Sequence, residues 1–180
     1  MVIQTERLIL REYVPEDWGQ VHIYASDADL VKYMDWGPNT EDDTRAFVEA
    51  MIKTQEQNPR AVYEFAVTLK TNGMLIGGSG LAIPQYGQAA LGYCLNKQYW
   101  GRGFATEAAS ALCGLGFRGL DLHRIFAACR PDNVASARVM EKIGMKREGM
   151  LREHMYAKGK WQNSFVYSIL ADEFLGMNGR

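Results

Sequence analysis

The feature that most constrains the fold is a strand-forming run broken by a tight turn signal, YEFAVTLKTNGMLIGGSGLAI at residues 63–83. The two halves of the run are separated by KTNG, in which Asn72-Gly73 is a strong hairpin turn signal. The β-rich segments on either side of it are therefore expected to pair antiparallel. A third β-rich run, AALGYCLN at residues 89–96, follows and extends the pair into an antiparallel meander.

Helix-like segments alternate with further strands along the rest of the chain. Thr40 and Asn133 are the expected N-caps of two of these helices. The expected order is strand 7–13, helix 15–26, helix 40–57, the meander, helix 104–117, strand 123–130, helix 133–145 and two closing strands near 145–153 and 161–171. No repeat or Gly/Ser linker divides the chain, so residues 1–180 are expected to form one domain of the α+β (mixed α/β) class.

Charge and cysteine content exclude several classes of function. Twenty Lys and Arg residues against twenty-one Asp and Glu residues give a formal net charge of −1, which offers no electrostatic surface for nucleic acid or an anionic membrane. Cys94, Cys113 and Cys129 form no CxxC pair and have no histidine at metal-ligand spacing, so no metal site is expected. The sequence starts without a basic and then apolar leader, and no run is long enough to span a bilayer. A cytoplasmic protein without nucleic-acid or membrane partners is expected.

The stretch YWGRGFAT, residues 99–106, is the strongest local indication of a ligand site. It joins a strand to the start of a helix, where unpaired backbone N–H groups meet the positive end of the helix dipole. Gly101 and Gly103 carry no side chain that would keep a phosphate from the backbone, and Arg102 adds a positive charge. A phosphate or pyrophosphate ligand is therefore predicted, and the alternative for a lone GxG pair is a tight turn.

Two other glycine motifs fit this stretch less well. A dinucleotide-binding fingerprint needs a third glycine where Thr106 stands, and NKQYW separates the strand from the first glycine. A P-loop needs a lysine and a hydroxyl residue after its second glycine, and these are absent. A nicotinamide-dependent oxidoreductase is therefore the weakest hypothesis, and a P-loop protein is excluded.

Segments spread over nearly the whole chain carry a family resemblance. They are TERLILREYVPED, LGYCLNKQYWGRGFATEA, LHRIFAACRPDNVASARVMEKIGM and EGMLREHMYAKGKW. They resemble the GCN5-related N-acetyltransferase (GNAT) family, in particular the branch that acetylates the N-termini of ribosomal proteins. The resemblance implies a central, mostly antiparallel sheet, flanked by helices, that splays between its fourth and fifth strands and holds acetyl-CoA in the opening.

The resemblance also implies which residues bind the coenzyme. The family's pyrophosphate loop reads Gln or Arg, two residues, Gly, one residue, then Gly or Ala, and its first position here is Trp100, which departs from that pattern. A main-chain N–H around Leu95 is expected to polarise the acetyl carbonyl as an oxyanion donor. The expected cofactor-binding residues are Cys94, Leu95 and Asn96 beside the pantetheine, then Trp100, Gly101, Arg102, Gly103, Phe104, Ala105 and Thr106, and finally Asn133 and Ser136.

Asn133 and Ser136 match the NxxS pattern at the start of the family's next helix. From the local sequence alone Asn133 is an N-cap and Ser136 belongs to the capping arrangement, whereas the resemblance places both at the cofactor. Many relatives have a tyrosine seven residues after this asparagine that protonates the departing thiolate, and Met140 stands there in this chain. Ser136 is the expected replacement, so Ser136 and Leu95 are the expected catalytic residues.

The activity that the resemblance implies is direct acetyl transfer from acetyl-CoA to a primary amine, with no covalent enzyme intermediate. The stretch QAALGYCL lacks the glutamate that many relatives use as a base, and the substitutes left open are Glu12, Asp35, Glu64 and His154. An α-amino group with a pKa near 7.8 needs less help from a base than a lysine amine with a pKa of about 10.4. The α-amine of a protein, peptide or amino acid is therefore the expected acceptor.

Three alternatives stay open. The acceptor would be bound by loops such as YMDWGPN and MYAKGKWQN, so a small-molecule amine, a polyamine or an antibiotic, is the alternative acceptor. A non-catalytic acyl-CoA-binding module is the alternative to an enzyme, because the usual tyrosine acid is absent. The oligomeric state is undecided between a monomer and a homodimer.

Overall fold

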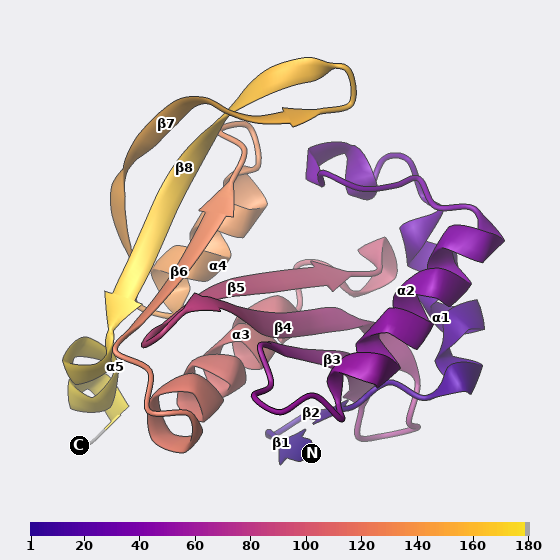
Figure 1. Ribbon diagram of the computed structural model, residues 1–180, viewed down its shortest axis with the longest axis horizontal. Coiled ribbons are helices and arrows are strands. Elements are labelled where there is room, and N and C mark those ends of the chain that lie inside the picture. The colour runs from indigo at the N-terminus through magenta and orange to yellow at the C-terminus, as the bar shows by residue number, and fades with distance from the viewer. Residues whose placement is uncertain (179–180) are drawn as a thin grey trace.

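An eight-stranded sheet in the order β1-β2-β3-β4-β5-β6-β8-β7 organises the computed structural model, which describes residues 1–178. Only β5 and β6 are parallel neighbours, and every other neighbouring pair is antiparallel. The strands are β1 (Val2–Gln4), β2 (Leu8–Arg11), β3 (Val62–Leu69), β4 (Leu75–Gln85), β5 (Gln88–Leu95), β6 (Arg124–Cys129), β7 (Lys146–Ala157) and β8 (Lys160–Leu170). The expected α+β class with a mostly antiparallel sheet is confirmed (Figure 1).

The helices follow the sequence signals at their starts. Thr40 caps α2 by accepting from the Asp43 N–H, and Asn133 caps α4 by accepting from the Ser136 N–H, as predicted. The α-helices are α1 (Trp18–Ala25), α2 (Glu41–Thr54), α3 (Phe104–Gly114), α4 (Val134–Lys142) and α5 (Ala171–Asn178), with 3-10 turns η1 (Pro15–Asp17), η2 (Val31–Tyr33) and η3 (Lys97–Tyr99) and a π-helical turn η4 (Leu115–Gly119). The sequence did not predict β1, α5 or the π-helical turn.

The sheet separates two apolar cores. One core packs α3 and α4 against the sheet and contains Phe65 and Val67 of β3. The other packs α1 and α2 against the opposite face and contains Ala66 of the same strand. Because side chains alternate across a strand, Glu64 belongs with Ala66 on the α1–α2 face. This face of the sheet matters for the acceptor side of the site.

β5 and β6 pair only over Gln88–Ala90 and Arg124–Phe126 and then diverge. β5 stays on β4 to its end, and β6 stays on β8, so the sheet opens into a V (Figure 1). These strands are the fourth and fifth of the sequence prediction, which did not include β1. The expected splay therefore lies where it was predicted.

The backbone of β5 presents hydrogen-bonding groups to this opening. The Asn96 N–H donates to Ile76 O of β4 at 2.8 Å, and Leu95 is the register partner of Gly77. In an antiparallel pair of strands, alternate residues point their N–H and C=O groups toward the partner strand. Because Asn96 points its groups toward β4, Leu95 points its own away from β4. Tyr93 and Leu95, which lie beyond the residues of β5 that pair with β6, consequently direct their main-chain N–H groups away from β4 and toward the opening.

Candidate active site

A cavity of about 920 Å³ lies between the diverging strands and the loops above them. Its lining includes residues 90–94 of β5, residues 127–130 at the end of β6, and the 33–39 segment after α1. Figure 1 shows the β7–β8 hairpin arching over the opening toward that segment. Lys158 at the hairpin turn donates from Nζ to the Gly37 carbonyl at 2.9 Å. The cavity is thus bounded by two loops that meet over the V.

The loop before α3 has the geometry of an anion site. Gly101 and Gly103 have φ angles of +74° and +82°, a region that side chains other than glycine rarely adopt. Gly103 is the N-cap of α3, and no side chain caps that helix. The N–H groups of its first turn are therefore available to an anion at the positive end of the helix dipole.

Side chains from distant segments hold this loop in place. Arg7 donates to the Arg102 carbonyl at 3.0 Å, and its guanidinium forms an ion pair with Glu107 of α3 at 2.7 Å. Trp100 donates from its indole N–H to the Leu95 carbonyl at 2.7 Å. Trp100, which departs from the family pattern, therefore has a structural role here, because its side chain links the loop to the end of β5.

The three residues expected beside the pantetheine occupy different environments. Leu95 turns its main chain toward the opening while its side chain lies in the core, and it is not part of the cavity lining. Cys94 lines the cavity, and burial raises the pKa of its thiol to about 12. The Asn96 carboxamide accepts from the Gln98 N–H at 3.0 Å and so begins η3. Contact of these residues with a pantetheine stays a prediction.

The predicted acid, Ser136, has a hydroxyl partner that the sequence did not indicate. Its Oγ lies 2.9 Å from Tyr93 Oη, and Tyr93 also donates to the Ser136 carbonyl at 3.0 Å. Burial raises the pKa of Tyr93 well above its ordinary value. Asn133, Ser136 and Tyr93 all line the cavity, whereas Met140 is completely buried. The backbone position of a tyrosine in place of Met140 would therefore lie in the core. In this chain the phenol belongs instead to Tyr93, on the opposite wall of the cavity.

A carboxyl group lies in the cavity wall on the α1–α2 face. Glu64 of β3 lines the cavity, and burial raises the pKa of its carboxyl to about 8. Two glycines of β4 make room for it: a Cβ at Gly80 would overlap Glu64 Oε2, and one at Gly78 would lie 3.2 Å from Oε1 and 2.5 Å from Tyr13 Oη. The absence of side chains at Gly78 and Gly80 therefore allows the Glu64 carboxyl and the Tyr13 phenol to face the cavity together.

The other open substitutes for the base lie elsewhere or carry other bonds. Glu12 forms ion pairs with the N-terminal amine and Arg60, outside the cavity lining. His154 is exposed on β7, and its Nδ1 lies 3.1 Å from Ser164 Oγ. Asp35 does line the cavity, but it is an exposed residue of the 33–39 segment. Glu64 is thus the carboxyl whose setting is best suited to a base.

The sequence prediction missed Tyr93 and left Glu64 as one of several alternatives. Tyr93 was part of the quoted strand AALGYCLN but carried no local signal of its own. The signal for Glu64 was the glycine pair 78 and 80, because glycine inside a strand often marks a place where another group approaches closely. That signal indicates an approach but does not name the approaching residue.

The matching family model is described as an acetyltransferase (GNAT) domain and covers residues 7–146. The chain belongs to the GNAT family. The N-acetyltransferase YnaD of Bacillus subtilis (strain 168) is 38% identical to this GNAT chain over 97% of its length and 99% of that of YnaD. The ribosomal protein uS5-alanine N-acetyltransferase of Escherichia coli (strain K12) is 22% identical over 96% of this chain and 92% of the relative. The crystal structure of a GNAT acetyltransferase from Bacillus anthracis aligns with a TM-score of 0.87 and 37% identity, over 96% of this chain and 100% of that one.

These comparisons confirm the predicted GNAT family and the enzyme class, and the similar proteins include a ribosomal-protein N-acetyltransferase. This GNAT protein is an acetyl-CoA-dependent N-acetyltransferase that transfers an acetyl group to an amine. Within residues 1–178, no helix is long and apolar enough to cross a membrane. The same residues contain no group of three or more His, Cys, Asp or Glu side chains placed to hold a metal ion.

Proposed function

We propose that this enzyme acetylates the α-amino group of a peptide, a protein N-terminus or an amino acid. The observation that carries the proposal is the Glu64 carboxyl in the cavity wall, with its pKa raised to about 8. A peptide α-ammonium has a pKa of about 7.7 to 8.0, so its proton passes to Glu64 with almost no free-energy difference. A lysine ammonium with a pKa of about 10.4 would lose its proton to the same group uphill by roughly 3 kcal/mol.

The donor half of the reaction uses the opposite end of the site. The pyrophosphate of acetyl-CoA lies against the Gly101–Thr106 loop, and the pantetheine adds to the free edge of β5. An outward-facing N–H of that strand polarises the acetyl carbonyl as charge develops on its oxygen. Leu95 is the donor expected from the sequence, and Tyr93 has the same backbone orientation one pleat nearer the cavity.

The amine attacks the thioester carbonyl directly, and Glu64 takes the proton that the nitrogen loses. Collapse of the tetrahedral intermediate releases the coenzyme A thiolate, which is protonated from the Ser136–Tyr93 hydroxyl pair on the other wall. Ser136 lies at the start of α4, whose dipole also favours a developing negative charge. The proposed base and acid thus lie on different walls of the cavity. The amine proton passes to Glu64, and the thiolate receives its proton from the Ser136–Tyr93 pair.

A matched pair of peptides tests the acceptor class. One peptide carries a free α-amine and an acetylated lysine, and the other carries an acetylated N-terminus and a free lysine. At pH 7.5 we expect kcat/KM to be about 10²-fold higher for the free α-amine, in proportion to the neutral fractions of the two amines. Mass spectrometry identifies the acetylated nitrogen and a thiol reagent follows coenzyme A release. Faster acetylation of the lysine would overturn the proposal, and absence of amine-dependent thiol release would favour an acyl-CoA-binding module.

The coenzyme loop is tested by Gly103→Val. A β-branched side chain is strained at φ +82° and would crowd Arg7 Nη2, which lies 3.4 Å from the position of a Cβ. We expect coenzyme A to bind at least about tenfold more weakly, or about 1.4 kcal/mol. Calorimetry measures the affinity, and circular dichroism establishes that the variant is folded. Gly149→Val on β7 is the matched control, because a Cβ there would meet nothing within 4 Å and the residue lies outside the cavity lining. Unchanged affinity in folded Gly103→Val would remove this loop from the coenzyme site.

A further inference from the structure

Arg130 is a cation buried at the cavity wall. It directly follows β6, is only 9% exposed and belongs to the cavity lining. Ile125, Ala127 and Cys129 of β6 lie in the core beneath α3 and α4, so the alternation of side chains directs Arg130 to the opposite face. Its contacts agree, because Nη1 donates to Ser164 Oγ at 2.7 Å and Nη2 contacts Met155 Sδ at 2.9 Å, both on the β7–β8 hairpin.

Both partners of Arg130 are neutral. Among residues 1–178, no carboxylate lies within ion-pair distance of it, in contrast to Arg11 with Asp17 and Arg124 with Glu148. Removing a guanidinium from water without a counter-ion is costly. A guanidinium has five N–H donors in a planar fork, and the hydroxyl and the thioether engage only part of them. The wall therefore holds an uncompensated positive charge with spare donors beside the cavity.

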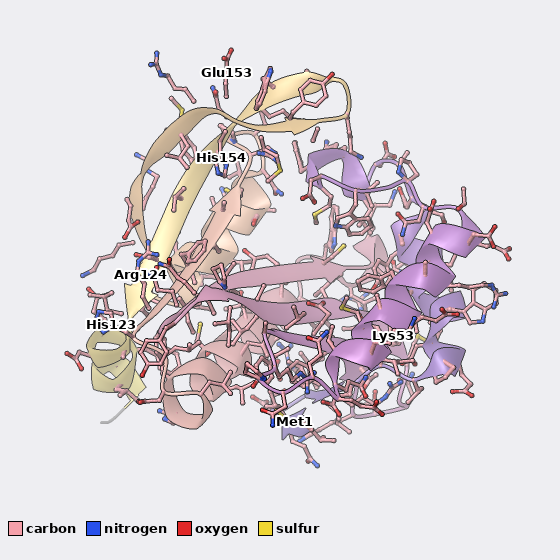
Figure 2. The ribbon with its side chains drawn as sticks, in the orientation of Figure 1. Met1, Lys53, His123, Arg124, Glu153 and His154 are labelled. Atoms are coloured by element: carbon pink, nitrogen blue, oxygen red, sulfur yellow. The ribbon has the colours of Figure 1, made fainter. Side chains whose placement is uncertain are left out.

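The hairpin is deformed where it meets Arg130. The register of β7 shifts between Leu151 and Met155, and Glu153 within this bulge has a φ of +47°. Figure 2 shows Glu153 on the outer side of the arch and His154 on its inner side. His154 Nδ1 lies 3.1 Å from the same Ser164 Oγ that accepts from Arg130. Bulges with a strained residue re-aim side chains and occur often at binding sites.

Among residues 1–178, none of the three acidic side chains that line the cavity, Asp35, Asp43 and Glu64, forms an ion pair with Arg130. Asp43 belongs to the capping box of α2, where Thr40 donates to it at 2.7 Å and lowers its pKa. Glu64 lies on β3, which is separated from β6 by β4 and β5 in the sheet. The cavity consequently has the proposed amine-binding side at Glu64 and, across the opening, one cationic side chain, Arg130. A single guanidinium balances one negative charge, which suits a carboxylate better than a phosphate dianion.

We propose that Arg130 binds a carboxylate of the acceptor, so that the enzyme selects amines carrying a negative charge a few bonds from the reacting nitrogen. This assignment rests on the proposed function, since it places the α-amine at Glu64. Among peptides and proteins, two sources have the required chemistry: the C-terminal carboxylate of a very short peptide, and an acidic side chain next to a protein N-terminus.

Two peptide pairs distinguish these sources. Ala-Ala-Ala as the acid is compared with its C-terminal amide, and Ala-Glu-Ala-amide with Ala-Gln-Ala-amide. For at least one pair we expect kcat/KM to favour the carboxylate by about 10- to 100-fold, the range of a charge-assisted hydrogen-bonded pair. In Arg130→Gln that ratio should fall to about one, and Arg130→Lys should restore part of it. Arg152→Gln removes an exposed arginine of the same hairpin and should keep the wild-type ratio.

A binding measurement distinguishes a failure of this inference from a failure of the proposed function. Calorimetry with the coenzyme A complex measures the same peptides without turnover, and a carboxylate preference that disappears in Arg130→Gln supports the assignment even if no peptide is acetylated. Equal affinities for both members of both pairs in the wild-type protein would overturn it. A preference that survives in Arg130→Gln would overturn it as well. Because the readout is a ratio within one variant, partial misfolding does not produce the expected result.

Discussion

A Glu64→Gln variant is expected to lose about 10²- to 10⁴-fold in kcat for α-amine acetylation, the usual contribution of a positioned base. Glutamine keeps the size and hydrogen-bonding capacity of the side chain between Gly78 and Gly80 but cannot accept a proton. Coenzyme A affinity, measured by calorimetry, should stay unchanged because the proposed pyrophosphate loop precedes α3, away from β3. Glu12→Gln is the matched control, since that carboxylate pairs with Arg60 outside the cavity lining.

The pH profile separates Glu64 from the acceptor's own ionisation. With an amine whose pKa lies well below 7, the acceptor is neutral throughout, so any rise in kcat/KM reports the enzyme. We expect the wild-type rate to rise with pH and level above about 8, the raised pKa of Glu64, and the Glu64→Gln rate to be flat. A wild-type profile without this rise, or a variant with wild-type kcat, would show that Glu64 is not the base.

The stability of the variant provides an independent check. The pKa of Glu64 is raised above its ordinary value of 4.5, so between about 4.5 and about 8 the folded protein binds more protons than the unfolded chain. The contribution of the protonated side chain is fully present below the lower value and is lost as the pH rises through the upper one. Urea unfolding should therefore show a decline in wild-type stability across this window that Glu64→Gln lacks.

A Ser136→Ala variant is expected to lower kcat by roughly 10²-fold while changing acetyl-CoA affinity little. A thiol with a pKa near that of cysteine, about 8.5, is only a moderately good leaving group at neutral pH, so protonation helps it to leave. The substitution spares the cap of α4, because Ser136 takes part in that cap through its N–H and uses its hydroxyl for Tyr93. Helix stability should therefore be preserved, and circular dichroism during thermal unfolding checks this.

Tyr93→Phe is the companion variant, because it removes the other member of the hydroxyl pair. If Ser136 donates to the sulfur and Tyr93 only hydrogen-bonds to Ser136, kcat should fall less in Tyr93→Phe than in Ser136→Ala. The reverse order would make Tyr93 the acid, and wild-type kcat in both variants would leave water as the proton source. An acetyl thioester with a more acidic leaving thiol should reduce the deficit of whichever variant lacks the acid, since that thiolate needs less help.

Local chemistry along the sequence determined the elements and the coenzyme side of the site. Asn72-Gly73 predicted the hairpin between β3 and β4, and Asn133 predicted the start of α4, because each depends on backbone conformation within a few residues. The Gly101–Gly103 loop is equally local: a strand, a turn and a helix start suffice to gather N–H groups. The family resemblance then located the splay between the strands that are β5 and β6.

Only the tertiary structure decided which side chains share the cavity. Alternation along β3 separates Glu64 from Phe65, but the register with β4 places Gly80 opposite Glu64 and Gly78 opposite Ala66, and these glycines leave space for a carboxyl. Tyr93 meets Ser136 across 43 positions of sequence, and Arg130 meets Ser164 across 34. Sequence spacing carries no information on such distances, because strand pairing and the twist of the sheet set them. The proposed coenzyme loop was therefore readable from the chain itself, whereas the proposed base, the hydroxyl partner of the proposed acid and the proposed acceptor wall required the fold.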